Sequence, residues 1–280
     1  MPCRHGLALT QADSVAGRTQ SLGGIVRVAV VGGTGVVGRH VVAAAAAAGH
    51  TPVVLSRSRG VDVTTGHGLD AAFDGVEAVI DVSNVTTTVR LRSVAFFVAT
   101  TEHLLAAGQR AGVKHHVALS IVGADRVDFG YYYGKRAQED LVLSGAVPAS
   151  VLRATQFHEF AGQLLARSTG PFAFVPRMRM QPVAAFEVAA ALVKLASGHA
   201  VGLASEMAGP EVHELVDLAR RVRSATAQRR AVVPLRLPGA TGKAMANGAL
   251  LPLDSGPRGE QTFASWLTAT GPQNGAASTT

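Results

Sequence analysis

A glycine-rich turn at residues 32–38 constrains this 280-residue chain more than any other feature. The turn reads Gly-Gly-Thr-Gly-Val-Val-Gly and stands between a run of β-branched residues and an alanine-rich stretch. A buried strand, a tight turn and a helix in that order predict a phosphate-binding unit, because the free N–H groups and the positive dipole end of the helix face the turn. The spacing of Gly32, Gly35 and Gly38 matches the fingerprint of dinucleotide-binding folds, whereas the Gly-Lys-Ser/Thr of a kinase-type loop is missing. The turn residues expected to contact the same ligand are Thr34, Val36 and Val37.

Short apolar runs alternate with longer helical patterns up to residue 154. The expected strands lie at 25–31, 52–55, 76–82, 113–119 and 149–152, and the expected helices at 36–48, 89–111 and 131–144. Strands that alternate with helices predict a parallel sheet covered on both faces. We therefore expect an α/β fold with a doubly wound, Rossmann-type parallel sheet over residues 25–154.

The alternation ends after Arg153. Residues 155–270 are expected to form a small C-terminal substrate lobe whose helices return onto the core. Its first part, up to residue 183, is rich in aromatic residues, Met and Pro and is expected to be a mobile lid or a small lobe over the sheet. Helical patterns follow at 185–197, 212–222 and 262–270, and a strand-like run at 231–237. The polar, aperiodic ends predict a disordered leader at 1–24 and a disordered tail at 271–280.

Composition narrows the class of protein. One cysteine, Cys3, rules out a disulfide scaffold and a cysteine-based zinc site, and the ten histidines lack metal-ligand spacings, so no metal is expected. No apolar run approaches the roughly 18 residues of a membrane span, and no secretory signal is apparent. We therefore expect a cytoplasmic protein without a membrane association.

The net charge of +7 leaves nucleic acid, a membrane surface and a phosphate-bearing cofactor as possible anionic partners. The most basic run, at 220–223, is expected to be the solvated face of a helix, since Leu215, Leu218 and Val222 share the opposite face. No nucleic-acid-binding motif accompanies this run, and no nucleic-acid partner is expected. The sequence does not indicate an oligomeric state.

The segment after the second expected strand bears on the choice of dinucleotide. It reads Ser56-Arg57-Ser58-Arg59, where an NAD site usually carries an acid for the ribose hydroxyls. Guanidinium and hydroxyl groups suit a 2′-phosphate, so NADP(H) is preferred and NAD(H) remains possible. A strand-like piece at 61–63 follows, and its Asp62 is expected to accept a hydrogen bond from the adenine amino group. Further along the cofactor, the expected contacts are Ser83 and Asn84.

Three residues form the catalytic candidate. Ser120 ends an expected strand, and Tyr131 and Lys135 lie four residues apart on one face of the next helix. An ammonium beside a phenol lowers the phenol pKa and makes it a usable acid, while a serine hydroxyl anchors a substrate carbonyl. The alternative is a merely structural Tyr/Lys pair. Expected to line the substrate pocket are Gln156, Phe157 and His158, although His158 suits a surface position equally well.

Together these segments resemble the short-chain dehydrogenase/reductase superfamily, and within it the atypical NmrA-like, NAD(P)H-binding branch. The likeness runs from about Ile25 to Leu267. It is carried by GGTGVVG at 32–38, SRSRGVDV at 56–63, VIDVSN at 79–84, ALSIVGAD at 118–125, YYYGKRAQE at 131–139, LRATQFHEF at 152–160, MAGPE at 207–211 and RGEQTFASWL at 258–267.

The resemblance implies a role for each candidate. It places the three glycines on the pyrophosphate, Arg57 on the 2′-phosphate and Lys135 on the nicotinamide ribose, with Tyr131 as acid and Ser120 as carbonyl anchor. The helix at 89–111 departs from the family because it lacks the Asn that completes the proton relay in fuller members. Relatives commonly begin just before the first strand, so residues 1–24 are expected to be dispensable, with a start near Val26.

Two functions follow from this reading. The first is an NADP(H)-dependent oxidoreductase acting on a small carbonyl or quinone-like substrate. The second is a dinucleotide sensor without turnover that binds a regulatory protein, because some relatives of this branch act in that way.

Overall fold

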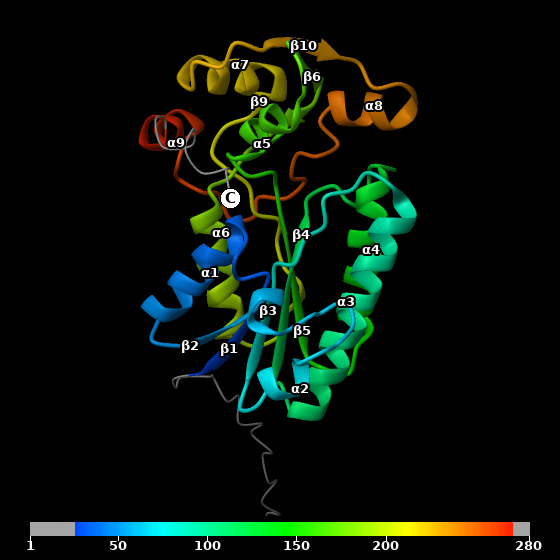
Figure 1. Ribbon diagram of the computed structural model, residues 1–280, viewed down its shortest axis with the longest axis vertical. Coiled ribbons are helices and arrows are strands. Elements are labelled where there is room, and N and C mark those ends of the chain that lie inside the picture. Colours follow the sequence, from blue (N-terminus) through cyan, green and yellow to red (C-terminus); the bar gives the residue numbers. More distant parts are fainter. Residues whose placement is uncertain (1–25, 271–280) are drawn as a thin grey trace, which may run out of the picture.

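The structure, a computed structural model, describes residues 26–270. The leader expected at 1–24, Ile25 and the tail expected at 271–280 lie outside the described residues. Figure 1 shows a central sheet flanked by helices, with a smaller group of elements beyond one end of the sheet.

All strand pairs of the six-stranded central sheet are parallel, and the order is β2-β1-β3-β4-β5-β8. Its strands are β1 (Arg27–Val31), β2 (Thr51–Leu55), β3 (Ala78–Asp81), β4 (His115–Ile121), β5 (Ala149–Ala154) and β8 (Gly202–Leu203). The chain moves from β1 outward to β2 and then crosses to β3 on the other side of β1. The strand order therefore reverses between β1 and β3, where open α/β sheets bind their ligands.

Helices cover both faces of this sheet (Figure 1). On one face α1 (Val36–Ala47) packs against α6 (Ala185–Ala196), and on the other α3 (Arg90–Ala111) packs against α4 (Gly130–Ser144). The α3–α4 contact is close because α4 carries Gly134, where a Cβ would overlap Ser93 and Phe97 of α3. The prediction of a doubly wound, parallel α/β fold is confirmed.

One expected strand is wrong. Residues 61–63 form no strand of the sheet, and Asp62 makes only an isolated antiparallel bridge with His67. Between β2 and β3 the chain forms a 3₁₀ turn, η1 (Arg57–Arg59), and a four-residue helix, α2 (Leu69–Ala72), which lies against α3. Strand β2 is therefore the edge strand on this side of the central sheet.

The group of elements beyond the central sheet consists of helices and two small, two-stranded sheets. Its helices are α5 (Phe160–Arg167), α7 (Leu215–Ala225), α8 (Gly239–Ala246) and α9 (Phe263–Thr270). Its strands are β6 (Phe172–Pro176) parallel to β10 (Ala231–Leu235), and β7 (Arg179–Met180) antiparallel to β9 (His213–Glu214). The segment expected to be a mobile lid or a small lobe contains α5, β6 and β7. Helix α7 begins three residues later than expected because the preceding residues pair with β7.

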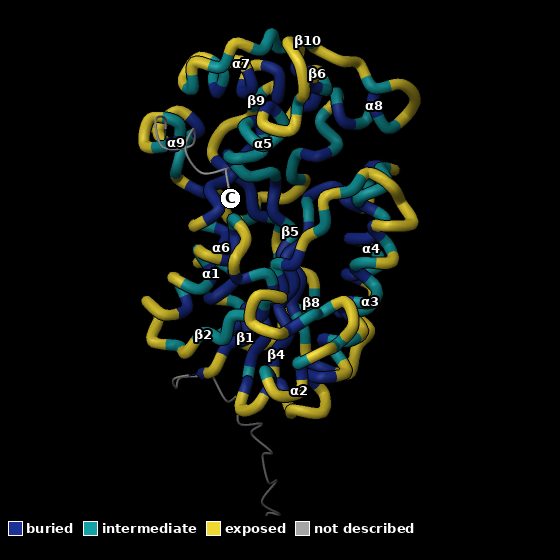
Figure 2. Tube along the Cα trace, in the orientation of Figure 1, coloured by how far each residue is buried: buried dark blue, intermediate teal, exposed yellow. Residues whose placement is uncertain are grey.

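Separate clusters of buried side chains hold these layers together, and Figure 2 shows the buried residues along the central strands. One cluster lies between the sheet and α1/α6, a second lies on the opposite face, and a third joins α5, α7 and β6. The third cluster includes Leu215, Leu218 and Val222, which confirms the predicted inward face of α7. Within residues 26–270, no helix combines the length and apolar character needed to cross a membrane.

Candidate functional site

The glycine turn lies at the point where the strand order reverses. Gly32 follows β1 with φ +76°, and the Gly35 N–H donates to the Gly32 carbonyl over 2.9 Å. A Cβ on Gly32 would lie 3.0 Å from the Val82 carbonyl oxygen after β3, and one on Gly38 would overlap the Gly32 carbonyl oxygen. Glycine is therefore required at Gly32 for the left-handed turn and at Gly38 for the close approach of α1 to the turn.

The first turn of α1 is open to an anion. Its N-cap is Gly35, no side chain caps the helix, and no acidic residue stands in its first turn. The unpaired N–H groups of such a helix end carry a partial positive charge. Of the neighbouring turn residues, Thr34 is exposed, whereas Val37 is buried and Val36 packs on the core. We therefore expect the backbone amides of the two valines, at the first turn of α1, to face a ligand.

The basic segment after β2 lies beside this turn. Parallel pairing of Val31 with Leu55 brings Ser56 level with Gly32. In η1, Arg57 is exposed, and the hydroxyls of Ser56 and Ser58 hydrogen-bond each other over 3.0 Å.

Asp62 is engaged within its own turn. Its Oδ1 accepts hydrogen bonds from the Thr64 N–H at 2.9 Å and the Thr64 hydroxyl at 2.6 Å. These bonds hold the pKa of the Asp62 carboxyl below its usual value. The expected contact with adenine would have to be made beside these bonds.

Buried polar groups extend the site past β3. Asp81 is fully buried; its Oδ1 accepts from the Ser83 N–H at 2.9 Å and its Oδ2 from Gln138 Nε2 at 2.7 Å. The hydroxyl of Ser83 is buried and has no hydrogen-bond partner among the described residues. Neither Asp81 nor Gln138 is among the site residues predicted from the sequence, although Gln138 lies three residues after Lys135 and hence on the same helix face.

Lys135 points into the core. Its ammonium donates to the Leu119 carbonyl at 2.9 Å and to Gln138 Oε1 at 2.8 Å, and it lies 4.3 Å from the centre of the Phe97 ring. Burial lowers its pKa to about 8, opposed by the charges of Asp81 and Glu139. The expected contact with a ribose would require the side chain to leave these partners.

Tyr131 contacts Asn84 instead of Lys135. Its hydroxyl donates to Asn84 Oδ1 at 2.6 Å, and its ring meets Phe97 edge to face. Burial raises the pKa of the Tyr131 phenol above its usual value, and Tyr132 and Asp81 raise it further. The prediction that Lys135 lowers this pKa is therefore wrong for this structure, because the ammonium is held against the Leu119 carbonyl.

Ser120 lies in β4 with its side chain buried. Its hydroxyl, like that of Ser83, has no hydrogen-bond partner within residues 26–270, and neither amide atom of Gln156 has one. Buried polar atoms are normally paired. Unpaired groups after β3, in β4 and after β5 therefore fit a site that a bound polar molecule would complete.

The residues after β5 divide between site and core. Phe157 packs on the cluster between the sheet and α1/α6. His158 is buried against Phe263 and Trp266, and its Nε2 donates to the Gln261 carbonyl at 3.0 Å. His158 thus contacts the C-terminal segment and is not a surface residue. Its Nδ1, like both amide atoms of Gln156, has no hydrogen-bond partner within residues 26–270.

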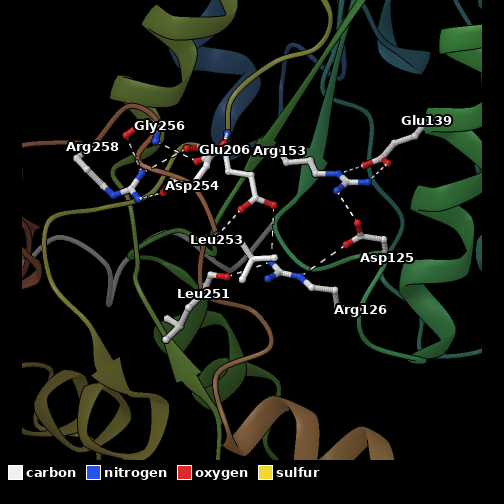
Figure 3. Close-up of polar contacts among 10 residues, drawn as sticks. All are labelled: Asp125, Arg126, Glu139, Arg153, Glu206, Leu251, Leu253, Asp254, Gly256 and Arg258. Atoms are coloured by element: carbon white, nitrogen blue, oxygen red, sulfur yellow. Dashed lines mark hydrogen bonds and ion pairs between the residues drawn. The ribbon is translucent and has the colours of Figure 1, made fainter.

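A network of ion pairs lies beside the end of β5 (Figure 3). Arg153 forms two bonds to the Glu139 carboxylate of α4, at 2.6 and 2.9 Å, and a third to Asp125 at 2.8 Å. Arg126 continues the network to Glu206, whose carboxylate also accepts from the Leu253 N–H. These contacts connect α4 and β5 to two later segments of the chain, at Glu206 and at Leu253. No local pattern in the sequence indicated these ion pairs.

The comparisons with known proteins bear on the fold. No protein-family profile and no curated protein matches this chain. Among solved structures, a short-chain dehydrogenase/reductase superfamily protein from Agrobacterium tumefaciens with bound NAD is 22% identical, with TM-score 0.63 over 88% of this chain and 96% of that one.

Two further solved structures are similar over most of their length. The UDP-N-acetylglucosamine 4-epimerase of Bacillus cereus is 16% identical, with TM-score 0.63 over 91% of this chain and 99% of that one. The NADPH-dependent quinone oxidoreductase of Escherichia coli, in complex with NADPH, is 19% identical, with TM-score 0.61 over 86% and 99%. At these identities the likeness is one of fold, and the fold of this chain is that of the Rossmann-like NAD(P)-binding proteins.

Proposed function

We propose that this chain binds NADP(H) across the carboxyl ends of β1, β2 and β3, as an atypical, NmrA-like member of the short-chain dehydrogenase/reductase superfamily. The observation that carries the proposal is the uncapped, acid-free end of α1 directly behind the glycine turn, with Arg57 beside it. The pyrophosphate would lie on the α1 amides, and Arg57 would pair with the 2′-phosphate. The bound NAD and NADPH of two structural neighbours support a nicotinamide dinucleotide.

We further propose that the protein reduces a small carbonyl or quinone-like compound. When bound, the nicotinamide supplies the hydride. The unpaired Ser120 hydroxyl would then hydrogen-bond the substrate oxygen, and the Tyr131 hydroxyl would donate the proton. A quinone oxidoreductase among the structural neighbours supports this substrate class.

A specific observation favours a second function, that of a dinucleotide sensor without turnover. The Tyr131 phenol has a raised pKa and Lys135 is held by Leu119 and Gln138, so the pair is not arranged as an activated acid. A sensor needs the glycine turn and Arg57 but does not need a phenol poised for proton transfer. Its partner would be a regulatory protein.

The distinguishing experiment combines binding and turnover. Purified protein is titrated with NADPH, then mixed with NADPH and a panel of ketones, aldehydes and quinones while absorbance at the NADPH band is followed. An enzyme consumes NADPH with at least one compound, and Tyr131→Phe then lowers turnover by on the order of 10²–10⁴ with NADPH affinity changed by only a few-fold. A sensor binds NADPH and consumes none. Absence of NADPH and NADH binding would overturn both functions.

The cofactor preference has its own test. Arg57→Ala is expected to weaken NADPH by roughly ten- to a hundredfold, the value of a charge-assisted contact, and to leave NADH within a few-fold. Arg110→Ala is the matched control, because Arg110 is exposed on α3 and pairs with Asp70. Equal losses for both cofactors would place Arg57 away from the 2′-phosphate.

A further inference from the structure

The outer face of the small β6–β10 sheet is apolar along its whole length. Register pairs Phe172 with Ala231, Phe174 with Val233 and Pro176 with Leu235. The alternate residues of β6, Ala173 and Val175, are buried, and Val232 of β10 packs on the same cluster. The six register-paired residues therefore share the opposite face, away from α7.

This face is exposed. Phe172 is 52% exposed, Phe174 58% and Leu235 39%. A sheet with one solvated face normally alternates apolar residues inside with polar residues outside. Here the outer positions carry no polar side chain, so the face is built for contact with something apolar.

Arginines stand at both ends of the face. Arg177 follows β6 and Arg236 follows β10, while Arg229 and Arg230 precede β10. The Arg177 N–H donates to the Leu235 carbonyl, and the Arg230 guanidinium donates to the Gly170 carbonyl, which fixes each end to the sheet. The two stretches that supply the strands and the turns beside them, 168–178 and 226–243, contain five Arg and Lys residues and no Asp or Glu.

We propose that this face docks on an anionic lipid surface, with the two phenylalanines in the interfacial region and the arginines on lipid phosphates. Interfacial binding scales with buried apolar area plus attraction of basic side chains to anionic lipid, and the face supplies both. The proposal departs from the expectation, drawn from the sequence, that the protein has no membrane association.

Charge and chemistry favour lipid over other occupants. In a symmetric pair of chains the arginine-rich ends would face each other, and like charges oppose association. A single-stranded nucleic acid stacks its bases on aromatic rings, but this face adds proline and aliphatic side chains that enter an acyl layer more readily than they contact bases. The proposal does not depend on turnover or on the dinucleotide.

The test is cosedimentation of the full chain with two kinds of vesicle. One is pure phosphatidylcholine, and in the other about one lipid in three is the anionic phosphatidylglycerol. Binding is expected only to the anionic vesicles and should weaken with added NaCl. Phe172→Ser/Phe174→Ser and, separately, Arg229→Gln/Arg236→Gln should each lower the partition coefficient about tenfold or more. The matched control is Leu91→Ser, which removes a side chain 81% exposed on α3 and should change nothing.

Melting temperature and NADPH affinity, measured on each variant, separate a lost surface from a lost fold. Binding to anionic vesicles that survives both double substitutions would overturn the proposal. A wild-type protein that does not bind anionic vesicles would also overturn it. In that case, loss of a dimer in light scattering of the Phe172→Ser/Phe174→Ser variant would assign the face to a second copy of the chain, and loss of binding to a single-stranded oligonucleotide would assign it to nucleic acid.

Discussion

The hydroxyl of Tyr131 donates a 2.6 Å hydrogen bond to Oδ1 of Asn84, a residue that follows β3. The long helix α3, which packs against the helix that carries Tyr131, has no Asn of its own to offer the phenol. In this chain an amide from the end of a neighbouring strand contacts the phenol instead. Asn84 therefore fixes the orientation of Tyr131 through a contact between segments 47 residues apart in sequence.

This bond predicts an energetic coupling between the two side chains. Asn84→Ala and Tyr131→Phe each remove the bond, so the double variant should be less destabilised than the sum of the single variants by about 0.5–1 kcal/mol. Urea unfolding of the wild type, both single variants and the double variant measures that difference. Strictly additive losses would mean that the hydrogen bond contributes nothing in solution.

Two glycines of the turn should respond differently to a methyl group. A Cβ on Gly38 overlaps the Gly32 carbonyl, so Gly38→Ala should destabilise the fold by about 1–3 kcal/mol. Gly35 has φ −74°, which alanine adopts readily, and a Cβ there approaches only the Gly32 oxygen, at 3.2 Å. Gly35→Ala should thus cost about 0.5 kcal/mol or less and yet weaken NADPH at least tenfold, because the methyl blocks the path to the α1 amides.

Thermal unfolding and NADPH titration of the same two samples check this prediction. The two variants serve as controls for each other, since each adds one methyl to the same turn. Unchanged NADPH affinity in a folded Gly35→Ala protein would place the pyrophosphate elsewhere.

The ion pair of Arg153 with Glu139 should contribute far more to the free energy of unfolding than the exposed ion pair of Arg110 with Asp70. Both side chains are nearly buried, so Arg153→Met leaves a carboxylate without its main partner in a poorly solvated place. We expect a loss of about 3–5 kcal/mol. Arg110→Met, which breaks the exposed pair with Asp70, should cost about 0.5 kcal/mol or less. Similar small losses in urea unfolding would show that water reaches the Arg153 pair.

Local patterns account for what the sequence predicted well. The strand, turn and helix at 27–47 are set by neighbouring residues: β-branched side chains, a positive φ at Gly32 and an alanine-rich helix. Their bounds agree with expectation to within a few residues. The pairing of β6 with β10 joins residues about 60 positions apart, and no local signal specifies it. Helix α8 was missed because Gly239 and Gly242 weaken the helical signal of an eight-residue segment.

In the site, too, local spacing predicted which residues share a face but not the contacts that depend on the assembled fold. Helical spacing placed Tyr131 and Lys135 on one face of α4, and the structure agrees that both side chains contact Phe97. Spacing does not determine which acceptor a long, flexible side chain selects. The choice of the Leu119 carbonyl and Gln138 by Lys135 depends on the packing of α4 against α3 and β4, which only the assembled fold defines.

The buried position of Lys135 predicts a pH dependence with a definite sign. Its pKa is about 8 in the folded protein, against 10.5 for an ordinary lysine, so between these values the unfolded chain binds the proton that the folded chain has lost. The stability of the wild type relative to Lys135→Met should therefore be lowest below pH 8 and rise by about 2–3 kcal/mol between pH 8 and 10.5. Urea unfolding at pH 7, 8, 9 and 10 measures this difference, and groups that titrate in both proteins cancel. A flat difference for Lys135→Met would show that its ammonium keeps an ordinary pKa, and that in solution Lys135 leaves the Leu119 carbonyl and Gln138 for the more polar position expected beside a ribose.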